Sequence, residues 1–250
     1  DPLAVYTNAT NILIDGLRVD NFGGGIWPRG ASPQSNGFNF KNLYFTYVRD
    51  DCIENDSMSG GTIEDSLFDG CYVGFSAAHP SPSGGGNTVN VKNMLVRLQN
   101  MPGGHGGFAG PTHGALFKWE TDGRSPKIVM QNNVFLIEGP GQSAASKLIP
   151  PPVSLQTASC SNNVIIWKGS GSFPTSIPYP ESCLRVVNWD SGGMNLWETK
   201  KADWLARHSG TDTIPPLAQC SDGIDNDGDN FIDLADPGCS SSTDNDETNI

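Results

Sequence analysis

The sequence predicts an all-β fold in which short strands form a solenoid, and three features of the chain lead to this class. The 250 residues include 30 glycines and 18 prolines but only 17% charged residues, which favours a turn-rich β protein over a helical one. An apolar strand, a polar turn and a second alternating strand recur six times. The copies follow one another at a step typical of one solenoid turn.

The repeat is defined by the apolar residue that follows each polar turn. This residue is Leu17, Leu43, Leu67, Met94, Val134 and Val164, at steps of 26, 24, 27, 40 and 30 residues. Asn, Asp and Gly occupy the turns, because they tolerate the left-handed backbone conformations of a tight corner. Stacking such coils at the ~4.8 Å strand spacing pairs each backbone with its neighbours and aligns the inward apolar side chains in ladders.

This repeat resembles the right-handed parallel β-helix, the fold of pectate lyases, polygalacturonases and phage tailspikes, over roughly residues 5 to 190. The resemblance implies about six coils. The longest step holds a Gly-rich insertion, residues 101–112, and loops that leave coil corners build the clefts of such scaffolds. A flexible spacer is the alternative interpretation of this insertion.

A short helix is expected after the last coil. Residues 197–208 place Trp197, Trp204 and Leu205 near one helical face, and we expect this helix to cap the open end of the solenoid. The predicted organisation is therefore 1–209 for the β-helix and its cap, 210–219 for a linker, and 220–250 for a small tail. No capping segment precedes the first coil, so we expect either further residues upstream or self-association through that uncapped end.

Charge and hydropathy exclude two classes of partner. The net charge of -12 comes mostly from residues 220–250, which contain nine acidic residues and no basic one. A nucleic-acid partner would require a basic face, and none is visible, so no nucleic acid is expected. No apolar run approaches the ~18 residues that span a bilayer, so no membrane span is expected.

The six cysteines form three local couples. These are Cys52 with Cys71, Cys160 with Cys183, and Cys220 with Cys239, at separations of 19, 23 and 19 residues. An even count at such spacing predicts three disulfides and an oxidising, extracellular compartment, although six cysteines allow about fifteen pairings. No couple has the spacing of a zinc or haem site.

The acidic tail has the ligand spacing of a calcium loop. The predicted ligands are the carboxylates of Asp225, Asp227, Asp229, Asp233 and Asp236 and the backbone carbonyl of Phe231. Alternate oxygens at this spacing wrap a hard cation. The loop resembles the thrombospondin type 3 calcium repeat, bracketed here by Cys220 and Cys239. Ca²⁺ is therefore the expected cofactor and the cell surface or exterior the expected location, with a disordered acidic tail as the alternative.

The densest chemical cluster is residues 49–56, which hold four carboxylates, an arginine and a cysteine. Carboxylates this close must bind a cation, pair with a base or stay neutral through a raised pKa. The repeat places further polar and aromatic residues on neighbouring coils. The predicted wall comprises Trp27, Arg29, Asp50, Asp51, Glu54, Asp56, His79, His113, Lys118 and Trp119. Such a wall suits an acidic polysaccharide; the alternative is a solvated corner tied together by its arginines.

Two short motifs resemble the polygalacturonase-like glycosidases of family 28. Asp50-Asp51-Cys52 is similar to their Asp-Asp-Cys motif, and residues 114–118 are similar to their Arg-Ile-Lys segment, with Leu116 in place of the arginine. The resemblance implies that Asp50 and Asp51 are the general acid and the water-activating partner, and that Lys118 binds a substrate carboxylate. Trp27-Pro28-Arg29 stands where that family has Asn-Thr-Asp.

A second chemistry remains open, which is β-elimination from a uronate by a base such as Lys118, Arg29 or a histidine, with a cation on the acidic cluster. The sequence thus predicts a secreted, calcium-binding β-helix protein that binds an acidic polysaccharide and is a candidate hydrolase or lyase. The alternative is a noncatalytic cell-surface module of adhesin or filament type.

Overall fold

The computed structural model describes residues 2–29, 37–81, 83–102, 111–139, 141, 147–174 and 179–209, and residues 220, 231, 235–241, 244, 246 and 248 of the tail. The chain divides into two compact units, Asp1–Leu205 and Ala206–Ile250. No helix in the described part of the chain is long and apolar enough to cross a membrane.

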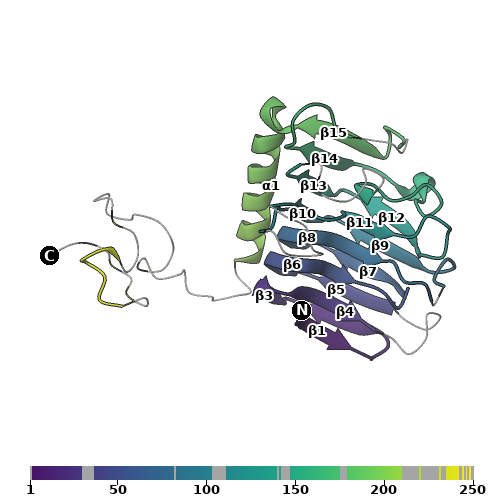
Figure 1. Ribbon diagram of the computed structural model, residues 1–250, viewed down its shortest axis with the longest axis horizontal. Coiled ribbons are helices and arrows are strands. Elements are labelled where there is room, and N and C mark those ends of the chain that lie inside the picture. Colours follow the sequence, from purple (N-terminus) through teal and green to yellow (C-terminus); the bar gives the residue numbers. More distant parts are fainter. Residues whose placement is uncertain are drawn as a thin grey trace. The chain divides into compact units, whose positions relative to one another are not determined.

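The first unit consists of two parallel β-sheets followed by a helix (Figure 1). The ten-stranded sheet contains β1 (Leu3–Thr7), β3 (Arg18–Phe22), β4 (Gly24–Pro28), β6 (Tyr44–Glu54), β8 (Leu67–Ala77), β10 (Leu95–Leu98), β11 (Phe117–Trp119), β13 (Val134–Ile137), β14 (Asn163–Trp167) and β15 (Leu184–Asn188). The five-stranded sheet contains β2 (Ile12–Asp15), β5 (Gly37–Lys41), β7 (Gly60–Glu64), β9 (Thr88–Lys92) and β12 (Lys127–Gln131). The helical segments are η3 (Thr157–Ser159), η4 (Trp189–Ser191) and α1 (Gly193–His208).

The chain passes from one sheet to the other and back, so that strands pair with strands of neighbouring repeats. In the five-stranded sheet the order β2, β5, β7, β9, β12 follows the chain, and every pairing in it is parallel. The predicted all-β class is therefore confirmed, and the arrangement is compatible with a parallel β-helix.

One residue in the left-handed region stands in the turn after each strand of the five-stranded sheet, and another stands at the corresponding corner before β14. These residues are Gly16, Asn42, Asp65, Asn93, Asn132 and Asn162. The last three also stack, because Asn162 Nδ2 donates to Asn132 Oδ1 at 3.2 Å and Asn132 Nδ2 donates to Asn93 Oδ1 at 3.2 Å. The repeated Asn, Asp and Gly corners of the sequence are thus the tight corners of the fold.

A buried polar side chain follows three of these corners and binds the repeat before it. The hydroxyl of Ser66 accepts the Leu43 N–H at 3.0 Å, and Asn133 Oδ1 accepts the Met94 N–H at 2.9 Å. Asn163 Oδ1 in turn accepts from Asn133 Nδ2 at 2.8 Å. Buried backbone donors need such partners, so these residues fix one repeat against the next.

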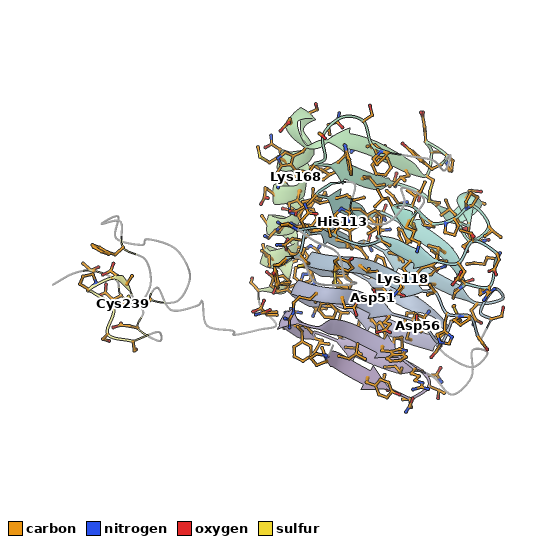
Figure 2. All side chains as sticks on the ribbon, in the orientation of Figure 1. Asp51, Asp56, His113, Lys118, Lys168 and Cys239 are labelled. Carbon is orange, nitrogen blue, oxygen red and sulfur yellow. A yellow bond between two sulfur atoms is a disulfide. The ribbon has the colours of Figure 1, made fainter. Side chains whose placement is uncertain are left out.

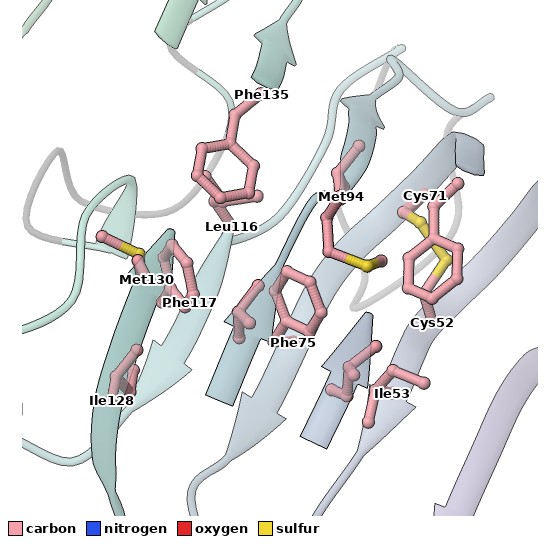
Figure 3. Close-up of a cluster of buried hydrophobic side chains, with 14 of the residues drawn as sticks. Cys52, Ile53, Cys71, Phe75, Met94, Leu116, Phe117, Ile128, Met130 and Phe135 are labelled. Carbon is pink, nitrogen blue, oxygen red and sulfur yellow. A yellow bond between two sulfur atoms is a disulfide. The ribbon is translucent and has the colours of Figure 1, made fainter. Parts of the chain in front are cut away.

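The interior between the sheets is filled by stacked apolar side chains (Figure 3). The ring centres of Phe45 and Phe68 are 4.7 Å apart, and those of Phe75 and Phe117 are 5.5 Å apart. In each pair the two rings are nearly parallel and come from neighbouring strands. The disulfide Cys52–Cys71 joins β6 to β8 inside this core. Cys160–Cys183 and Cys220–Cys239 are also formed, so all three predicted pairings are confirmed.

Helix α1 lies along the outward side of the ten-stranded sheet, which corrects the expectation of an end cap (Figure 1). Trp197 and Trp204 are buried in a cluster with Leu67, Leu95, Val134, Leu136, Val164 and Ile166. Trp204 Nε1 donates to Asp65 O at 3.1 Å, and Lys201 Nζ lies 2.6 Å from Asp69 Oδ2. The physical reason is that these strands present a broad apolar face, which offers the two tryptophans more burial than a single strand edge would.

Replacing Trp204 by alanine should lower the free energy of unfolding by about 3 kcal/mol or more, because it removes a large buried side chain and its hydrogen bond. Denaturant unfolding of the full chain measures the effect. Met194→Ala on the same helix is the matched control, since Met194 is 48% exposed and its loss should change stability by no more than about 0.5 kcal/mol. Equal effects of the two changes would contradict the placement of α1.

Candidate functional site

The candidate site centres on Asp51 in β6. Asp51 is only 2% exposed, and its Oδ2 accepts a hydrogen bond from Lys118 Nζ at 3.2 Å. Lys118 lies on β11, which pairs with β8, and β8 pairs with β6, so residues 67 positions apart meet here. Figure 2 labels both side chains. The Lys118 side chain is 40% exposed, and the pair therefore opens to solvent on the lysine side.

The backbone of β6 changes register just before this centre. The pairing of β6 with β8 is regular up to Val48, shifts between Val48 and Asp51, and is regular again from Asp51 onward. Irregularities of this kind change the direction of a side chain and are common beside active sites. The shift places the Asp51 carboxyl beside a lysine two strands away.

Asp51 holds its proton more strongly than an ordinary aspartate. Burial raises the pKa of Asp51 to about 6; the attraction of Lys118 offsets only part of this shift, and the charge of Asp50 adds to it. Its second oxygen, Oδ1, is buried and has no hydrogen-bond partner among the residues that the structure describes. An unsatisfied buried carboxyl oxygen costs stability, which is typical of functional sites.

Glu54 and Lys118 complete the electrostatics of the centre. Burial, then the charges of Asp51, Asp56 and Asp50, raise the pKa of Glu54 to about 7. Burial disfavours the ammonium of Lys118, but the attraction of Asp51, followed by Asp56 and Asp50, outweighs it and raises the lysine pKa. Two carboxyls able to carry a proton near neutral pH therefore lie beside a permanent cation.

Glu54 and Lys118 belong to one column of side chains that crosses the strands. Glu54 pairs with Ser76, and Ser76 pairs with Lys118. The hydroxyl of Ser76 also lies 3.5 Å from Asp56 Oδ1, which brings Asp56 to the same place. The neighbouring column, one residue earlier on each strand, belongs to the buried core. Alternation along the strands therefore turns the Glu54 column outward.

The column continues to β4 and β1 through two aromatic residues. Ile26 pairs with Ile53, so Trp27 lies beside Glu54, and Tyr6 pairs with Trp27. Tyr6 is not among the residues predicted from the sequence, although its position one repeat before Trp27 would have placed it in the same column. We give the name column face to the outward surface formed by Tyr6, Trp27, Arg29, Glu54, Asp56 and Lys118, together with Asp50 and two buried residues, Ser76 and Asp51.

The histidines and Trp119 lie elsewhere. Trp119 is buried in the core opposite Ala77, and its Nε1 donates to Pro126 O at 2.9 Å. His113 is buried too, with Nε2 2.7 Å from Gly139 O. Neither reaches the surface that the sequence assigned to it. His79 is exposed just beyond the end of β8, where its ring contacts the Ser81 carbonyl.

Little of the predicted calcium loop falls within the described residues. Asp225, Asp227, Asp229 and Asp233 lie outside them, as do the linker 210–219 and residues 103–110 of the Gly-rich insertion. Of the remaining ligands, Phe231 is exposed, whereas Asp236 is buried and its Oδ1 accepts the Gly238 N–H at 2.6 Å. Among the residues that are described, no group of three His, Cys, Asp or Glu side chains is placed to hold a metal ion. Calcium binding stays a prediction.

Comparison of the chain with protein-family models, with curated proteins and with solved structures finds no match. The column face is the part of the described structure whose chemistry points to a function. Its centre combines a buried carboxyl that retains a proton, further carboxyls beside it and a fixed ammonium. Groups with pKa values near the working pH are suited to general acid–base catalysis.

The raised pKa values predict how Asp51 and Glu54 affect stability. Between its unfolded and folded pKa a carboxyl of this kind binds more protons in the folded chain, so its contribution to the free energy of unfolding falls as pH rises. The interval runs from 3.8 to about 6 for Asp51 and from 4.5 to about 7 for Glu54. The stability of Asp51→Asn and of Glu54→Gln, each relative to wild type, should therefore increase across these intervals.

Urea unfolding at a series of pH values measures this difference. Asp122→Asn is the control, because Arg124 lowers the pKa of the exposed Asp122 and the relative stability of this variant should show no such rise. A flat difference for both Asp51→Asn and Glu54→Gln would contradict the description of the centre.

Proposed function

We propose that the first unit is a right-handed parallel β-helix of about six coils whose column face binds an acidic polysaccharide and hydrolyses it at Asp51. The observation that carries this proposal is the buried Asp51 carboxyl, which retains a proton to about pH 6 while Lys118 holds one of its oxygens. A carboxyl of that kind, next to other carboxylates on an exposed face, is suited to protonate a leaving oxygen.

In the proposed reaction the two roles that the resemblance implies are exchanged, because Asp51 is the residue with the raised pKa. Asp51 donates its proton to the glycosidic oxygen as the bond from that oxygen to the anomeric carbon breaks. Asp50 accepts a proton from the water that attacks the same carbon from the other side. Burial, with the charge of Asp50 adding to it, keeps Asp51 protonated at mildly acidic pH, and Glu54, whose pKa is raised to about 7, is protonated there as well. The products are two shorter chains, one with a new reducing end.

The charge of Lys118 favours hydrolysis over β-elimination. A base that abstracts a proton must first be neutral, but the surrounding carboxylates raise the pKa of Lys118 and keep it protonated. A permanent ammonium suits the two other roles, which are to hold Asp51 and to attract a carboxylate of the polymer. Elimination would need another base on the column face.

The spacing of the column suits a polymer that runs across the strands. Neighbouring parallel strands lie ~4.8 Å apart, which is close to the length of one pyranose unit. The half-exposed ring of Tyr6 offers an apolar surface on which a sugar ring can stack. The three disulfides support an extracellular location, where such polymers occur.

The enzyme proposal is tested by the release of reducing ends from polygalacturonate or alginate. Asp51→Asn should lower the rate by about a hundredfold or more, because it removes the general acid. Lys118→Met should lower the rate as well, since it removes both the partner of Asp51 and the anion-binding charge. Asp122→Asn, an exposed carboxylate away from the column face, should leave the rate unchanged.

Other outcomes of the same assay separate the alternatives. Glycan binding by wild-type protein without any product would replace the enzyme by a noncatalytic cell-surface module. Products that absorb ultraviolet light as unsaturated uronates would identify a lyase.

We also propose that the tail binds Ca²⁺ through its aspartates, on the strength of their spacing and of the Cys220–Cys239 disulfide that closes the loop. Calorimetric titration of the full chain should detect calcium binding. The double change Asp227→Asn with Asp229→Asn should weaken calcium affinity by about tenfold or more, because it removes two ligand charges. Asp244→Asn, in the same tail but outside the loop, is the control. Equal affinity of all three proteins would reject the loop as the site.

A further inference from the structure

We infer that Arg29, held between Tyr6 and Trp27, forms a subsite that binds the carboxylate of a uronate residue about three sugar units from the one that Lys118 attracts. The inference rests on the proposed polysaccharide binding and adds to it a substrate class and a second recognition point. It concerns the β1 and β4 end of the column face, away from Lys118.

Arg29 is exposed, yet contacts from two strands hold its side chain in place. Its Nη1 donates to the hydroxyl of Tyr6 at 2.7 Å, and its guanidinium carbon lies 5.6 Å from the centre of the Trp27 ring. The Arg29 backbone N–H donates to Thr7 O at 2.8 Å, which fixes the base of the side chain. A group held in this way loses little conformational freedom when it binds a ligand.

The guanidinium keeps most of its hydrogen-bonding capacity for a ligand. It has about five N–H donors in a planar fork that matches the two oxygens of a carboxylate, and Tyr6 takes one of them. Within the described part of the chain no carboxylate lies within ion-pair distance of Arg29, whereas Arg97 pairs with Glu138 and Arg124 pairs with Asp122. The structure therefore holds an oriented cation whose anion is not among the described residues.

The surroundings explain why the partner would be an acidic sugar. Tyr6 is 48% exposed and meets the Trp27 ring edge to face at 5.3 Å, so its ring can lie against the apolar face of a pyranose while Arg29 meets the carboxylate. Further along the face, Glu54 and Asp56 would repel a uronate, and Lys118 is the next cation. Trp27 and Lys118 lie three strands apart, or about 14 Å. A polymer whose acidic units are separated by about three strand spacings would bring one carboxylate to Arg29 and another to Lys118.

The test is the affinity of the full chain, by calorimetric titration, for oligogalacturonate, for its methyl ester and for a sulfated neutral galactan of similar length. Arg29→Gln should weaken binding of the uronate roughly tenfold to a hundredfold, the size of a lost charge-assisted pair, and should leave the methyl ester unaffected. Tyr6→Phe, which frees the guanidinium, should weaken uronate binding roughly threefold.

Arg124→Gln is the matched control, an exposed arginine outside the column face. Equal losses for uronate and methyl ester, no loss for either, or no binding of any of the three glycans by wild-type protein would overturn the inference. So would a greater loss for the sulfated galactan than for the uronate. The proposed hydrolysis is judged separately: if Asp51→Asn still releases reducing ends while Arg29→Gln loses uronate affinity, the subsite stands and the catalytic role fails.

Discussion

The register between neighbouring repeats is the constraint on which the rest of the structure depends. Side chains alternate along a strand, so a slip of one residue would turn Glu54 inward and expose the phenylalanine stack. The left-handed corners set the length of each turn, and the buried amides of Asn133 and Asn163 tie consecutive turns at one position. The order of the whole stack thus arises from local features, namely the corners and the buried polar side chains that follow three of them.

The column face inherits its geometry from this register and departs from it at one place. Where the regular pairing of β6 with β8 is interrupted, Asp51 lies beside Lys118 and is still buried. Lost hydration raises the energy of the carboxylate, and the ammonium recovers only part of that energy. The burial that makes the centre costly for folding also raises the pKa of Asp51 toward neutral pH, and proteins commonly accept such a cost at functional sites.

Features encoded locally could be predicted from the sequence, and features that depend on relative placement could not. The repeat, its corners and the disulfides follow from spacing along the chain, and so does the nearness of Asp51 and Lys118. The burial of Trp119 follows from alternation along β11, which turns Trp119 to the same side as Phe117 once Lys118 faces outward, and the bounds and direction of that three-residue strand could not be read from the sequence. Tyr6 was missed because nothing in its own segment is unusual.

The position of helix α1 was also predicted wrongly, because a helix with two tryptophans on one face can cover either the end of a solenoid or the outer face of a sheet. Its packing across the sheet also restricts its length. Its 16 residues extend about 24 Å, close to five strand spacings, and Trp197 and Trp204 contact strands at different heights along that length. The length of the helix is therefore matched to the number of strands that it crosses. Insertion or deletion of a whole turn would displace one tryptophan from its strands, so related chains should vary in their loops and keep the number of turns constant.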